Sequence, residues 1–112
     1  MDGNGNIEVT APKNITMNAG ESIMMSAGQN IVATAQKNIN VIAGESITEI
    51  ATEDYNLTAS NITENAVVSK NSKAKKMIEN MGNGSFLTTK DFINVESKKE
   101  VNINSGKEVK MQ

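Results

Sequence analysis

The feature that most constrains the fold is an alanine that returns every eight residues through the first half of the chain. The seven alanines are Ala11, Ala19, Ala27, Ala35, Ala43, Ala51 and Ala59. Four residues before each lie Ile7, Ile15, Ile23, Ile31, Ile39, Ile47 and Tyr55, and two residues before each lie Val9, Met17, Met25, Ala33, Val41, Glu49 and Leu57. The repeating unit is therefore Ile-x-Val/Met-x-Ala followed by a three-residue connection.

Within a unit, the apolar residues fall two positions apart, which is the period of a strand with one buried face. The same positions would spread around a helix. Gly20, Gly28 and Gly44 directly follow the repeated alanine, where we expect a corner with an unusual backbone angle that glycine adopts readily. A five-residue strand and a tight corner every eight residues predict an all-β, octad-repeat triangular β-helix, that is, a β-solenoid. A β-sandwich with evenly spaced strands is the alternative, but sandwiches vary their loop lengths.

The predicted triangular cross-section has three sides of similar sequence, and either one chain or three chains could build it. The inward residues are small to medium, as a narrow three-sided interior requires, and no capping element is evident at either end. Single-chain solenoids usually have differing sides and dedicated caps. We therefore expect three intertwined chains, a homotrimer, in which each octad rises about 4.8 Å along the axis.

Composition narrows the range of functions. Aromatic residues make up 3% of the 112 residues and hydrophobic residues 38%, a thin supply for a compact core. The net charge is −2, and all basic residues are lysines, which gives no electrostatic case for a nucleic-acid partner. Cys and His are absent, which removes disulfides, thiolate metal sites and the commonest general base. We expect no cofactor, no catalytic residue and no enzymatic activity, and synthesis in the cytoplasm without a signal peptide.

The octad pattern weakens after Ala59 and returns as Ser85-x-Leu87-x-Thr89, Ile93-x-Val95-x-Ser97, Val101-x-Ile103-x-Ser105 and Val109-x-Met111. Ile47 and Ile93 are 46 residues apart, two short of six octads, so the register shifts between the blocks. The sequence predicts a regular β-helix over 1–60, an irregular or helical interruption over 61–84, and a second β-helix block over 85–112.

Two alternatives stay open for the interruption. Ala74, Met77, Ile78 and Met81 have helical spacing, with Ser72 and Gly82 as caps, which indicates a short helix within 70–82. Alternatively, Met77, Met81 and Gly82 continue the second block's octads as looser β-structure. We favour the second interpretation, because a helix would have to splay away from the axis.

Two candidate sites follow from the repeat. Glu49 occupies an inward position, and three carboxylates near a threefold axis would have to be protonated or bind an axial cation. Alternatively, a local register adjustment turns Ile50 inward and Glu49 outward. At the other end, three copies of Val109 and Met111 would either present an apolar platform or simply close the core.

The opening DGNGNI (residues 2–7) and the octads KNITMNAGESI (13–23) and KNINVIAGESI (37–47) resemble the C-terminal β-helix of VgrG spike proteins of type VI secretion systems. The needles of contractile phage tail spikes are similar in build. The resemblance implies a homotrimeric needle that is delivered outside the cell by a contractile apparatus and pierces a target envelope. It also implies secreted effectors as partners and a PAAR-type tip protein, for which Val109 and Met111 are the possible contact. The family's N-terminal hub is missing here, so we expect the chain to correspond to a fragment.

The sequence therefore predicts a structural spike segment whose function is mechanical. The alternative is a trimeric adhesin stalk or a single-chain β-solenoid that binds a ligand along one side. A binding solenoid should repeat particular exposed residues on one side, whereas the outward positions here are mixed.

Overall fold

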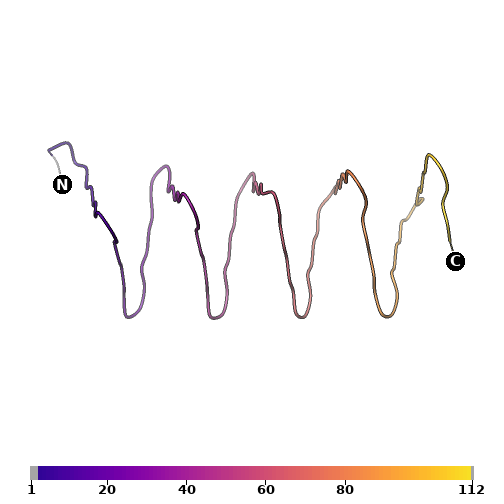
Figure 1. Ribbon diagram of the computed structural model, residues 1–112, viewed down its shortest axis with the longest axis horizontal. Coiled ribbons are helices and arrows are strands. Elements are labelled where there is room, and N and C mark those ends of the chain that lie inside the picture. Colours follow the sequence, from indigo (N-terminus) through magenta and orange to yellow (C-terminus); the bar gives the residue numbers. More distant parts are fainter. Residues whose placement is uncertain (1–2, 112) are drawn as a thin grey trace. The chain divides into compact units, whose positions relative to one another are not determined.

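The computed structural model describes residues 3–111, in two units, Met1–Thr58 and Ala59–Gln112. Over the described range the chain contains no helix and no strand: extended segments alternate with short bends (Figure 1). Within each unit the trace winds as an open coil, and no two described residues twelve or more positions apart have Cα atoms within 8 Å. Strand hydrogen bonds need a neighbouring segment, and within a unit a single chain supplies none.

The bends of the first unit follow the eight-residue repeat. They lie at residues 12–13, 20–21, 28–29, 36–37, 44–45 and 52–53, each directly after one of the repeated alanines. Before them, Gly3 and Asn4 form a turn that ends at Gly5, while Asp2, which also belongs to the opening DGNGNI, lies outside the described residues. The repeat in sequence is therefore a repeat in backbone conformation.

In the second unit the bends continue through the segment where the sequence pattern weakens. They lie at residues 60, 67–68, 75, 82–83, 90–91, 98–99 and 106–107. Each again follows one inward position: Ala59, Ala66, Ala74, Met81, Thr89, Ser97 and Ser105. Two of these steps, Ala59 to Ala66 and Ala74 to Met81, are seven residues long instead of eight. Together they account for the two residues by which the spacing from Ile47 to Ile93 falls short of six octads.

The segment over 70–82 is extended, with bends at residues 75 and 82–83, and contains no helix. The structure has no strand there either, so the looser β-structure favoured from the sequence stays a prediction. The division of the chain into 1–60, 61–84 and 85–112 stays a prediction.

The expected backbone angle at the corner glycines is wrong. Gly20, Gly28 and Gly44 each begin a bend, but Gly5, at φ +84°, is the one described residue with a positive φ. The bends therefore use ordinary negative φ values, which any L-residue can adopt. A Cβ added at Gly28 would meet no atom within 4 Å, so close packing does not require glycine there either.

The described part of the chain has no buried residue. The total accessible surface is 13447 Å², whereas a folded monomer of this mass exposes about 6,000 Å² and a fully unfolded one about 17,000 Å². Even the isoleucines of the repeat keep 52–73% of their surface exposed. The chain by itself therefore has no hydrophobic core.

Candidate functional site

The face that the repeat assigns to the interior differs from the other face in exposure. Ile23, Ile31 and Ile47 are 52–59% exposed, whereas the apolar residues next to inward positions, Met24, Val32, Ile42 and Ile50, are 82–92% exposed. The two alternating faces of the extended segments are thus distinct. The less exposed one carries the Ile, Val/Met and Ala positions, which are the predicted core residues.

In the second unit, the inward positions are found by counting back from each bend, because the last inward residue directly precedes the bend. The first inward positions of successive segments are Ile62, Lys70, Met77, Ser85, Ile93 and Val101, and the middle positions are Glu64, Ser72, Glu79, Leu87, Val95 and Ile103. Charged residues therefore occupy the inward face between 64 and 79. Sequence reasoning missed them, because the two seven-residue steps displace them from the octad phase.

Glu49 and Tyr55 pair along the inward face of the first unit. The Tyr55 hydroxyl donates a hydrogen bond to the Glu49 carboxylate, which raises the pKa of Tyr55 above its ordinary value, and the negative charge of Glu49 acts in the same direction. The two residues are the middle position of one segment and the first position of the next. Glu49 thus has a protein partner on its own chain, and the axial cation predicted for it stays a prediction.

Lys70 lies between two glutamates of the second unit. Its ammonium forms an ion pair with the carboxylate of Glu64. A hydrogen bond to Glu64 and the charge of Glu64 raise the pKa of Lys70, partial desolvation opposes this, and Glu79 adds a weaker attraction. Glu64, Lys70 and Glu79 are inward residues of three consecutive extended segments. Their charge interactions therefore connect one segment of the repeat to the next.

Hydroxyl groups brace the last three bends. The backbone N–H of Asp91 donates to Thr89 Oγ1 at 3.4 Å, that of Lys99 to Ser97 Oγ at 3.3 Å, and that of Lys107 to Ser105 Oγ at 3.2 Å. In each case the acceptor is the inward residue before the bend, and the donor is two residues later. Ser and Thr bond in this way to nearby backbone at turns. The second block's replacement of Ala by Thr or Ser therefore has a local structural role.

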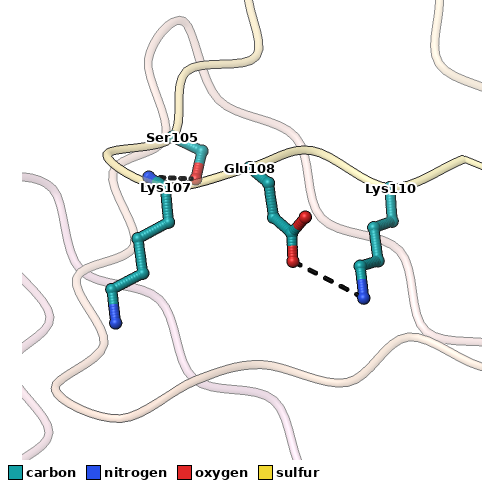
Figure 2. A network of polar contacts seen from close by, with 4 residues as sticks. All are labelled: Ser105, Lys107, Glu108 and Lys110. Carbon is teal, nitrogen blue, oxygen red and sulfur yellow. Dashed lines mark hydrogen bonds and ion pairs between the residues drawn. The ribbon is translucent and has the colours of Figure 1, made fainter.

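The outward face near the C-terminal end carries its own polar contacts. Lys110 Nζ lies 3.5 Å from Glu108 Oε1, and Figure 2 shows this pair beside the Ser105–Lys107 bend. Asn102 Nδ2 donates to Glu100 Oε1 at 3.3 Å. Val109, between Glu108 and Lys110, is 49% exposed, and Met111, which follows Lys110, is 86% exposed. Their proposed contact with a tip protein stays a prediction.

The family of the chain follows from comparison with known proteins. Residues 3–112 match the family described as "Uncharacterized protein conserved in bacteria (DUF2345)". This match spans nearly the whole sequence. The chain belongs to the DUF2345 family. Searches of curated proteins and of solved structures returned no match for it.

The described residues of this DUF2345 chain hold no group of three or more His, Cys, Asp or Glu side chains able to bind a metal ion. Nor is any helix in that range long and apolar enough to cross a membrane. A hollow lined by the contiguous residues 95–101 lies around the bend at 98–99. The inward face of the repeat, which is less exposed than the other face, is the candidate functional surface of this DUF2345 chain.

Proposed function

We propose that this DUF2345 chain is a needle segment of a contractile injection apparatus, similar to the C-terminal β-helix of VgrG spikes. Three copies intertwine into a triangular β-helix that is delivered outside the cell and pierces a target envelope. The function is mechanical, and no residue acts as a catalyst. A PAAR-type tip protein on the Val109 and Met111 end, and secreted effectors, are the partners that this proposal includes.

The observation that carries the proposal is the regular apolar face that a single chain leaves exposed. Burying apolar surface contributes about 25 cal/mol per Å², so a stripe of isoleucines at half exposure favours association strongly. The stripe recurs every eight residues through the first unit and returns from Ile93 onward, which suits a partner with the same repeat. A second and third copy of this chain fit that requirement.

The backbone supports the same arrangement. The described extended segments have no strand partner within their unit, so their edges are open to pairing with another chain. Intertwining three chains would place a segment of a sister chain on each side, and stacked strands without free lateral edges resist bending. A narrow rod built in this way concentrates an applied force at its tip.

The test is the solution mass by light scattering, with small-angle X-ray scattering on the same sample. We expect three times the chain mass of 12.0 kDa and a rod-like profile. A compact 12.0 kDa monomer would overturn the proposal and favour a single-chain solenoid. Because an adhesin stalk is also trimeric, a second assay separates the two: binding of a PAAR-type protein, which Met111→Asp should abolish while Lys110→Gln should not.

A further inference from the structure

The inward charges of the second unit coincide with its irregular spacing. Glu64 and Glu79 are the middle inward residues of the segments that end the two seven-residue steps, and Lys70 begins the segment between them. Lys70 pairs with Glu64 and also lies close enough to Glu79 to be stabilised by it. The side chains of the Lys70–Glu64 pair are 62% and 53% exposed, against 77% and 68% for the outward Lys110–Glu108 pair.

A uniform octad repeat leaves one problem unsolved for an assembly of identical chains. If one chain slides by eight residues, its Ile, Val/Met and Ala positions meet equivalent positions on the neighbours, and the apolar burial hardly changes. Register is weakly specified wherever the pattern that sets it repeats. Some non-repeating feature is needed to distinguish the correct alignment from the slipped ones.

We propose that Glu64, Lys70 and Glu79 set the axial register of three copies of this chain by forming stacked layers of opposite charge inside the assembly. This inference rests on the proposed trimeric needle. In register, three Lys70 ammonium groups lie between a level of three Glu64 carboxylates and a level of three Glu79 carboxylates. Consecutive segments rise by one strand spacing, about 4.8 Å, so each lysine reaches glutamates of its own and of sister chains.

A slipped chain breaks this order at a high cost. A slip by one segment moves its Glu64 or its Glu79 to a level where the sister chains carry no charge, and that buried carboxylate loses the lysines of the sister chains. Leaving a buried charge unpaired is strongly unfavourable, whereas a complete set of pairs is roughly neutral in stability. The charge layers therefore act mainly on alignment. The two seven-residue steps also disfavour a slip, because a slipped chain would place a seven-residue side next to an eight-residue side of a sister chain.

The first experiment compares charge reversals at inward and outward positions of the full chain. Lys70→Glu creates three adjacent levels of like charge, and we expect loss of the trimer mass or a fall in the unfolding midpoint by roughly 10 °C or more. Lys110→Glu is the matched control, because it reverses the same residue type in an outward Lys–Glu pair. We expect the control to shift the midpoint by about 2 °C at most.

A full inversion guards against a variant that simply fails to fold. Glu64→Lys, Lys70→Glu and Glu79→Lys together restore alternating layers with opposite signs, and we expect the trimer mass and most of the lost midpoint to return. The inference is overturned if Lys70→Glu behaves like Lys110→Glu. It is also overturned if the triple variant is no better assembled than Lys70→Glu alone.

Register itself can be read from a cross-link. The chain has no cysteine, and Ile42 is outward and 92% exposed, so Ile42→Cys supplies a single reactive thiol. In register, the three thiols lie on different sides of the prism, whereas a slip by one octad brings two onto neighbouring strands about 4.8 Å apart. A short bismaleimide should yield no covalent dimer in the otherwise unchanged chain. It should yield dimer with Lys70→Glu wherever that variant still assembles.

The outcomes separate this inference from the proposed function. A 12.0 kDa monomer for the unchanged chain contradicts the needle itself. A trimer that cross-links through Ile42→Cys without any charge reversal leaves the needle intact but overturns the assignment of register to these three residues.

Discussion

The two units of this molecule shape their bends with different chemistry. In the first unit, the inward alanine is followed by glycine at three bends, and alanine carries no hydroxyl group that could accept a hydrogen bond there. In the last three bends of the second unit, Thr89, Ser97 and Ser105 replace alanine, and each accepts a backbone hydrogen bond across its bend. The comparison teaches that a small inward position can precede a bend in either unit, and that a hydroxyl at this position also fixes the bend by a hydrogen bond.

The inward faces differ as well. The first unit is apolar along almost its entire inward face, with Glu49 as the charged exception, whereas the second unit places Glu64, Lys70 and Glu79 there. In the proposed trimer, the first unit would bury its isoleucines against the other two chains. The second unit adds contacts within its own chain, and the predictions below test this division.

The largest effect should follow from a charge on the apolar inward face of the first unit. Ile31→Asp would place three carboxylates without cationic partners in the interior of the proposed trimer, at a cost of roughly 3 kcal/mol or more. We expect the variant to remain at the 12.0 kDa monomer mass by light scattering.

Val32→Asp is the matched control, because Val32 is the adjacent residue on the other face and is 82% exposed. It should assemble normally. Equal behaviour of Ile31→Asp and Val32→Asp would contradict the distinction between the two faces.

A smaller effect is expected from removing the hydroxyl brace of the second unit. Ser97→Ala and Ser105→Ala each delete one hydrogen bond, worth about 0.5–1.5 kcal/mol per chain. The unfolding midpoint should fall by a few degrees in each variant and add in the double variant, because the bends are separate. Ser26→Ala, at an outward position of the first unit, should leave the midpoint unchanged, and a similar fall there would count against the brace.

Glycine substitutions should sharpen the same comparison with still smaller changes. Gly28 has a negative φ and open space around its Cβ position, so Gly28→Ala should be neutral or stabilise by about 0.4–1 kcal/mol, by restricting the unfolded chain. Gly5 has φ +84°, so Gly5→Ala should instead destabilise the opening turn by about 1 kcal/mol. Urea unfolding of both variants measures the difference, and a cost at Gly28 equal to that at Gly5 would show that the corner needs glycine after all.

The sequence periodicity predicted the positions of the bends better than it predicted which residues lie on the inward face. The alanine repeat placed every bend of the first unit, because a small residue recurs where the chain turns. The inward placement of Glu64, Lys70 and Glu79 was not predicted, because a repeat of fixed length cannot follow two steps of seven residues, although the 46-residue spacing signalled the shift. The glycine argument failed because it inferred a backbone angle from residue type, whereas these bends keep negative φ.

The smallest effect concerns the pair that links two segments of the first unit. Glu49 raises the pKa of Tyr55, and the bond from the neutral hydroxyl thus contributes stability below pH about 10, which is lost as pH rises through the raised pKa. Tyr55 is the single tyrosine and the chain has no tryptophan, so its ultraviolet absorbance reports this titration directly.

Glu49→Gln removes the charge but keeps a hydrogen-bond acceptor, and we expect the titration midpoint of Tyr55 to move down toward its ordinary value. Glu53→Gln, which removes a nearby charge of the same sign, is the control and should leave that midpoint in place. An identical midpoint in the unchanged chain and in Glu49→Gln would mean that the two side chains do not pair in solution. In an assembled needle, three Glu49 charges would face three Tyr55 hydroxyls in a less hydrated interior. The upward shift of the Tyr55 titration midpoint should then grow with protein concentration as the trimer forms. The titration of Tyr55 would thus also report on association of the chain.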